Sequence, residues 1–139
     1  MKITEIVSTN KKSRYRTGLC DIMALAIHEL TTLPLGLWRG IFDDDFGDEG
    51  DERYEDCHAV VVVSFDPPSW IDVDGMHYGE PVNCIFSEIP KRLELVPASR
   101  DEVEQAFTTE DFNNKEFNIA KQYILSDDTL RKLVAFFKK

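Results

Sequence analysis

The chain has 139 residues, a usual length for one domain, and can bury a hydrophobic core without help from disulfides or a metal. Charged residues make up 30% of it and the formal net charge is −10, which argues against nucleic acid or an anionic membrane surface as a partner. Residues 1–16 contain no apolar run typical of a signal peptide, and no stretch approaches the roughly 20 apolar residues that span a bilayer. We therefore expect a cytoplasmic protein.

The three cysteines, Cys20, Cys57 and Cys84, are an odd number in a chain expected to be cytosolic. Because that compartment keeps thiols reduced, the count predicts free thiols rather than a disulfide framework.

The first part of the chain predicts a short strand over residues 2–8, a polar loop over 10–17, and then the clearest helix of the sequence over 19–30. Gly18 stands just before this helix and Pro34 forbids its continuation. Apolar residues occupy nearly every side of the helix, so it should be largely buried.

Residues 35–42 follow as a strand interrupted by glycines. Residues 43–56 contain nine acidic residues and one arginine, together with Gly47 and Gly50, and predict a solvated loop. The acidic run lacks the ligand spacing of a calcium-binding EF-hand loop. The alternative interpretation is that this acidic segment forms a surface that recruits a basic partner.

Residues 57–65 form the best strand of the sequence, because the run is β-branched and too short for a typical helix. A turn at 66–69 and a second strand at 70–73 predict a hairpin in which Phe65 pairs approximately with Trp70. Further on, the sequence predicts a turn at 74–75 and a third strand over 82–88.

The C-terminal part is helical in pattern. Ser99 and Glu102 make a capping box, Thr109 can cap a helix through about Tyr123, and Asp127 or Asp128 can cap a last helix over 129–137. The order predicts an α+β domain over residues 1–139, with a buried N-terminal helix on an antiparallel sheet and peripheral helices within 98–139.

Three side chains fall where a thiol mechanism needs them: Cys20 at a helix start, His58 at a strand start, and Asp72 on the next strand. The N–H groups at a helix N-terminus favour a thiolate, and the Leu19 and Cys20 amides there are candidate donors to an oxyanion. A histidine on a neighbouring strand can accept the thiol proton and return it, and an Asp can orient the imidazole.

The predicted hairpin register leaves His58 and Asp72 offset by several residues, an offset that a bulge or a longer turn could shorten. Asp74 lies on the same face as Asp72 and is the alternative orienting carboxylate.

The segments 18–26, 58–61 and 70–75 resemble the papain-like superfamily in its minimal form, which includes cysteine peptidases, amidases and transglutaminase-like proteins. They also look like small phage and bacterial proteins in which Cys, His and Asp-x-x-Gly elements recur. The resemblance covers about residues 15–90 and implies a papain-like core with a Cys20–His58–Asp72 triad that acts through a thioester. Many members carry a Gln upstream of the cysteine; here Asn10 is the one amide side chain before Cys20.

Each of these residues also has a simpler interpretation. Cys20 can be a small buried hydrophobe on a core helix, the commonest fate of a free cysteine. His58 can be a strand-edge residue, and Asp72 can cap the turn that follows it. His28 is expected at the core boundary and His77 on the surface. A zinc set of Cys20, Cys57, His58, His77 and Cys84 lacks the usual ligand spacing.

The sequence therefore predicts a small thiol hydrolase or acyltransferase that acts on an amide or ester bond of a protein or peptide substrate, with no cofactor. The competing hypothesis is a non-catalytic acidic protein, encoded by a phage, that binds and inhibits a host protein.

Overall fold

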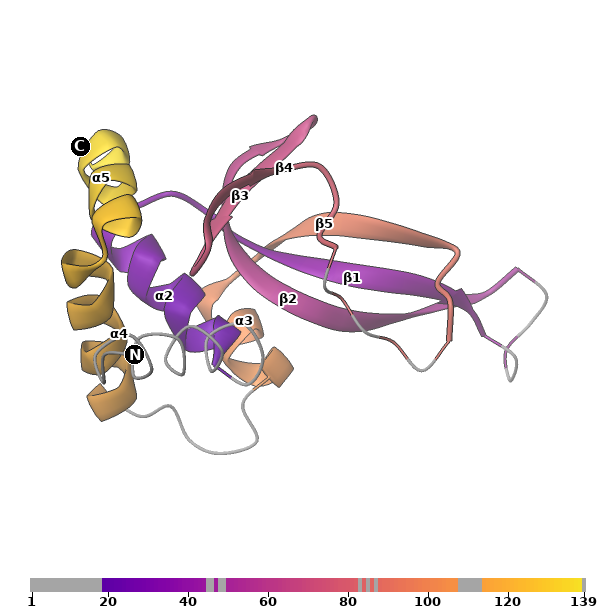
Figure 1. The fold of residues 1–139 in the computed structure, drawn as a ribbon. Helices are drawn as coiled ribbons and strands as arrows, with labels where there is room; N and C mark the ends of the chain where they lie inside the picture. The colour runs from indigo at the N-terminus through magenta and orange to yellow at the C-terminus, as the bar shows by residue number, and fades with distance from the viewer. Residues whose placement is uncertain are drawn as a thin grey trace, which may run out of the picture.

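The computed structural model describes residues 19–44, 47, 50–82, 84, 86, 88–107 and 114–138. Within these ranges four helices accompany one antiparallel sheet of five strands, so the expected α+β class is confirmed (Figure 1). The elements are α2 (Cys20–Thr31), β1 (Leu35–Asp43), β2 (Glu52–Phe65), β3 (Pro68–Asp72), β4 (Gly75–Tyr78), β5 (Arg92–Ala98), α3 (Arg100–Phe107), α4 (Asn114–Ser126) and α5 (Asp128–Phe137). The predicted strand at 2–8, Asn10 and Gly18 lie outside the described residues.

Helix α2 is the predicted buried helix, and nearly all of its first eight side chains are inaccessible to solvent. It ends where Thr32 adopts a left-handed conformation with φ of 63° and its N–H donates to the carbonyl of His28. Pro34 follows, and β1 begins directly after it. The apolar composition and the proline together produce a helix that is buried over its first eight residues and stops close to the predicted place.

The strand order in the sheet is β4-β3-β2-β1-β5. Strands β1 and β2 form a long hairpin whose register runs from Leu35 opposite Val61 to Asp43 opposite Glu52. The predicted loop over 43–56 is therefore wrong at both ends, since Asp43 belongs to β1 and 52–56 belong to β2. Ladder hydrogen bonds and ion pairs across the hairpin keep this charged stretch extended.

The β2–β3 hairpin is tighter than the sequence predicts. Phe65 lies opposite Pro68 rather than Trp70, and a register shift between Val62 and Ser64 then brings Val61 opposite Ile71. The short turn and the irregularity both move β3 along β2 in the same direction. They carry the end of β3 toward the start of the β-branched run, where His58 lies.

Two strands were not foreseen. Strand β4 has four residues and begins at Gly75, and β5 contains Pro97 and alternating charges. Both lie at edges of the sheet, where a short strand or a proline is tolerated. The strand predicted over 82–88 is wrong for the residues described there, none of which is in a strand.

The main core lies between α2 and the sheet, and the C-terminal helices complete it. Ala120 and Ile124 of α4 and Leu130 of α5 are buried in the same cluster as α2, so these helices are not peripheral. A second, smaller cluster holds Trp38 and Trp70 with Val60 and Val62, the residues that alternate with the main-core positions of β2. The strands are therefore buried on two sides.

The predicted caps of α3 and α5 are present. Ser99 Oγ accepts from the Glu102 N–H and Glu102 Oε1 accepts from the Ser99 N–H, while Asp127 accepts from the Leu130 N–H. The described part of α4 begins at Asn114, and Thr109 lies outside the described residues.

Figure 1 shows the helices gathered at one end of the sheet, while the far end of the β1–β2 hairpin extends away from them. Among the described residues, no helix has the length and apolar character that crossing a membrane requires.

Candidate active site

Cys20 is the first residue of α2, directly after the N-cap residue Leu19. Its side chain is 2% exposed and belongs to the main hydrophobic core. The thiol is free. The predicted placement of this cysteine at a helix start is therefore confirmed, and so is its burial, which the simpler core interpretation also required.

His58 and Asp72 lie together, as a triad needs. His58 Nε2 is 2.8 Å from Asp72 Oδ2, and both side chains are buried. Cys20 lies near enough to His58 to contribute to the raised pKa of the imidazole. The offset expected from the predicted hairpin is removed by the tighter register of β2 and β3.

Asp72 contacts two further groups besides His58. Its Oδ1 accepts the Asp74 backbone N–H at 2.8 Å and lies 2.7 Å from His77 Nε2. Of the two candidate orienting carboxylates, Asp72 is thus the one that contacts the imidazole, and Asp74 contributes its backbone.

His77 contacts this cluster from a partly exposed position, so it takes part in the site although the sequence suggested only a surface residue. It lies opposite Trp70 on β4, its ring stacks on the Trp70 indole with centroids 4.3 Å apart, and its side chain is 34% exposed. The Asp-x-x-Gly turn could have predicted the place of His77 in the sequence, because a turn at 73–74 brings the following residues back alongside Trp70. The prediction would also have required strand β4, which carries His77 and was not predicted from the sequence.

The charges of the cluster are coupled. Burial lowers the pKa of His58, but hydrogen bonds to Asp72 and Cys20 and the charges of these groups outweigh burial and raise the pKa to about 9. Burial raises the pKa of Asp72, yet the hydrogen bond to His58 and the charges of His58 and His77 bring it below its usual value. The pair is therefore an imidazolium and a carboxylate at neutral pH.

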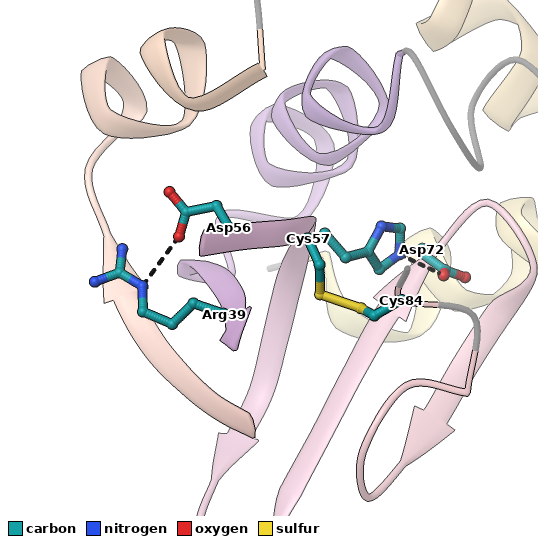
Figure 2. The surroundings of a disulfide bond; sticks show 6 residues. Arg39, Asp56, Cys57, Asp72 and Cys84 are labelled. Atoms are coloured by element: carbon teal, nitrogen blue, oxygen red, sulfur yellow. Dashed lines mark hydrogen bonds and ion pairs between the residues drawn. A yellow bond between two sulfur atoms is a disulfide. The ribbon is translucent and has the colours of Figure 1, made fainter. Parts of the chain in front are cut away.

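Cys57 and Cys84 are joined by a disulfide, so the prediction of three free thiols is wrong (Figure 2). The number of cysteines and the cellular compartment say nothing about the distance between any two of them. The fold brings the Cα atoms of Cys57 and Cys84 to 5.6 Å, which suits a disulfide. The bond removes both sulfurs from the alternative zinc set, and no three His, Cys, Asp or Glu residues among those described are grouped to hold a metal.

A cavity of about 200 Å³ opens beside His58. Apolar and aromatic groups form much of its wall, carboxylates and two imidazoles form the rest, and Cys20 is not among the described residues that line it. The lining residues are Cys57, His58, Trp70, Asp72, Asp74, His77, Tyr78, Glu80, Pro81, Val82 and Cys84. Among the described residues, the cavity therefore meets the imidazole of His58 but not the thiol of Cys20.

His28 is separate from this cluster. Its Nδ1 is 2.5 Å from the Leu33 carbonyl oxygen, at the C-terminal end of α2 and two turns from Cys20. The prediction of a boundary histidine agrees with this contact.

Comparison of the chain with protein-family models, with curated proteins and with solved structures finds no match. The arrangement of its own residues therefore carries the functional argument.

Proposed function

We propose that this protein is a thiol hydrolase or acyltransferase that acts on an amide or ester bond through Cys20, His58 and Asp72. The observation that carries the proposal is the hydrogen bond between Asp72 and His58, with the free thiol of Cys20 at a helix start near enough to raise the pKa of His58. Each of the three groups has the role that covalent acyl transfer requires.

In this mechanism the His58 imidazolium holds the proton that Cys20 has given up, and Cys20 Sγ bonds as the thiolate to the carbonyl carbon. The backbone amides of Leu19 and Cys20 at the start of α2 are the candidate donors to the developing oxyanion. His58 then gives the proton to the leaving amine or alcohol, which departs as the thioester forms. Water or an acceptor amine attacks the thioester and releases the acyl group, while His58 takes and returns one proton.

The papain-like assignment remains part of this proposal. A helix that begins with the cysteine, an antiparallel sheet that carries the histidine and the aspartate, and a cavity beside the imidazole all support it. A protein or peptide substrate follows from the same assignment.

The test is acylation of the thiol by an activated ester such as p-nitrophenyl acetate, followed by intact-mass and peptide-mass analysis. We expect an acetyl group on Cys20, formed at least tenfold more slowly in His58→Ala and Asp72→Asn. His28→Gln removes an imidazole from the same helix and should leave the rate unchanged. Acylation that is independent of His58 would contradict the proposal.

One observation favours a second candidate, in which the cavity binds a partner and Cys20 is a core residue. The thiol is 2% exposed and does not line the cavity. This candidate corresponds to the acidic binding protein expected as an alternative from the sequence. It predicts that no ester acylates Cys20 in the folded protein, at any pH at which the fold is stable.

A further inference from the structure

The cavity beside His58 brings a molecule that enters it into contact with a disulfide rather than with the free thiol. Cys57 and Cys84, which form the disulfide, both line this cavity and are half-buried (Figure 2). Cys20 is 2% exposed and is not among the described residues of the lining. The sulfur chemistry available to a ligand in the cavity is therefore that of the Cys57–Cys84 bond.

A β-bulge explains why Cys57 and His58 both face the cavity. Consecutive side chains of a regular strand point to opposite faces of the sheet. In the ladder between β1 and β2, however, Trp38 lies opposite His58 and Arg39 lies opposite Asp56, so the ladder skips Cys57. Cys57 is thus the extra residue of a bulge, which re-aims the side chains around it. The bulge places a disulfide sulfur and an imidazole on neighbouring residues of one wall.

The two sulfur atoms of the disulfide have different surroundings. Cys57 is next to His58, whose imidazole is positively charged at neutral pH through its pairing with Asp72. A nearby cation stabilises a thiolate, and a stabilised thiolate leaves a disulfide faster. Cys84 lies in the connection 79–91, none of whose described residues belongs to a helix or strand. Cys57 is therefore the better leaving group, and Cys84 is the sulfur to be attacked.

We infer that the Cys57–Cys84 disulfide exchanges with thiols that enter this cavity, and that its substrate is a cysteine side chain or a small free thiol. The cavity volume of about 200 Å³ suits a group of that size. No step of the exchange uses Cys20, so this activity goes beyond the acyl transfer proposed above.

In the exchange, the substrate thiol loses its proton to solvent and its sulfur bonds to Cys84 Sγ. The Cys57–Cys84 bond breaks, and its electron pair stays on Cys57 Sγ as a thiolate next to the His58 imidazolium. A second substrate thiolate then bonds to the substrate sulfur of this mixed disulfide and releases Cys84 Sγ, which takes a proton from solvent. Two substrate thiols are thereby oxidised to one disulfide, while the protein disulfide is reduced by two electrons.

The test is reduction of the full, oxidised chain by a thiol, with quenching by N-ethylmaleimide and peptide-mass analysis. The thiols are mercaptoethanol and a short, neutral, blocked peptide that contains one cysteine, and oxidised glutathione is the reference disulfide for each. We expect a rate that is proportional to thiol concentration and at least tenfold above the reference, with the mixed disulfide on Cys84 and the maleimide on Cys57. A larger ratio for the peptide would identify a peptide cysteine as the source, and a larger ratio for mercaptoethanol would identify a free thiol.

A matched pair of histidine variants tests the role of the imidazole. His58→Gln removes the positive charge next to Cys57 and should slow the reduction about tenfold. A variant that merely loosened the fold would expose the disulfide and be reduced faster, so the direction of the change separates the two effects. His28→Gln removes an imidazole at the other end of α2 and should leave the rate unchanged.

Several results would overturn the inference. A rate independent of thiol concentration would mean that opening of the fold limits the reduction. A rate no higher than that of the reference disulfide, a rate in His58→Gln equal to or above that of wild-type protein, or a mixed disulfide on Cys57 would each contradict it. Acylation is scored on Cys20 and exchange on Cys84, so this inference and the proposed function can fail separately.

Discussion

The two ends of the sheet are stabilised by different forces. At the helical end, α2 and the C-terminal helices bury strands β1, β2 and β3 in a continuous apolar core (Figure 1). At the projecting end, the same strands β1 and β2 carry charges that are paired across strands. The difference shows that one strand can belong to two environments, and β2 changes from one to the other at Cys57 and His58.

At the projecting end the pairs are formed by residues distant in sequence. Arg92 of β5 bonds both carboxylate oxygens of Glu52, Lys91 bonds Asp43 and Glu52, and Arg39 bonds Asp56. Such pairs are weak when exposed, so this end should contribute little to global stability. The candidate active site lies at the boundary, where β2 becomes buried.

The largest expected effect is in the helical core. Leu25 of α2 has no exposed surface, and Leu25→Ala should lower the free energy of unfolding by about 4 kcal/mol, through lost burial and a cavity. Leu125→Ala, at a half-exposed helical position, is the matched control and should cost far less. Urea unfolding followed by circular dichroism measures both. Equal losses would contradict the assignment of the core to the helical end.

The second largest effect on stability is expected from loss of the Cys57–Cys84 disulfide. It links β2 at the boundary to the cavity wall across 27 residues, and the loop-closure entropy of that span corresponds to about 3.5 kcal/mol. Reduction, or the double change Cys57→Ser and Cys84→Ser, should lower the free energy of unfolding by up to this amount. If unfolding with and without reductant coincides in wild-type protein, the bond does not constrain the chain.

The His58–Asp72 pair should make stability depend on pH. The pKa of His58 is raised from 6.5 to about 9, so its contribution is fully present below pH 6.5 and is lost as pH rises through about 9. The shift corresponds to at most about 3 kcal/mol. The lowered pKa of Asp72 acts in the opposite sense, since its contribution is lost as pH falls below the usual range of Asp.

Urea unfolding at a series of pH values should therefore show a decline between pH 6.5 and about 9 that is absent in His58→Gln. His28→Gln should retain the decline. An unchanged pH profile in the His58 variant would mean that the buried pair carries no such linkage.

The smallest effect is expected at the projecting end. Hydrogen bonds from Arg92 and then Lys91 lower the pKa of Glu52 to about 2, so its contribution is present above about pH 4.5 and is lost as pH falls toward 2. Glu52→Gln should lower the urea midpoint only slightly at neutral pH and low salt. The difference should disappear in about 1 M salt, which screens exposed charges. A large, salt-independent loss would show that this end belongs to the core.

Several features were readable from the sequence, because they depend on neighbours along the chain. The apolar run and Pro34 predicted α2, the β-branched run predicted most of β2, and the capping residues Ser99 and Asp127 predicted the starts of α3 and α5. Cys20 and Asp72 could be chosen because each stands at the beginning or end of such an element, and His58 because it begins the β-branched run, although β2 itself starts earlier, at Glu52.

Only the tertiary structure decided how these elements meet. The register of β2 and β3 brings Asp72 to His58, β4 adds His77, and the fold brings Cys57 to Cys84. The charged residues 52–56 resemble a loop in sequence and become a strand because their partners lie on β1 and β5. For the proposed nucleophile Cys20, helix formation fixes the position locally, whereas long-range strand pairing brings His58 and Asp72 together. Local patterns determine the elements, whereas contacts between distant residues determine the site.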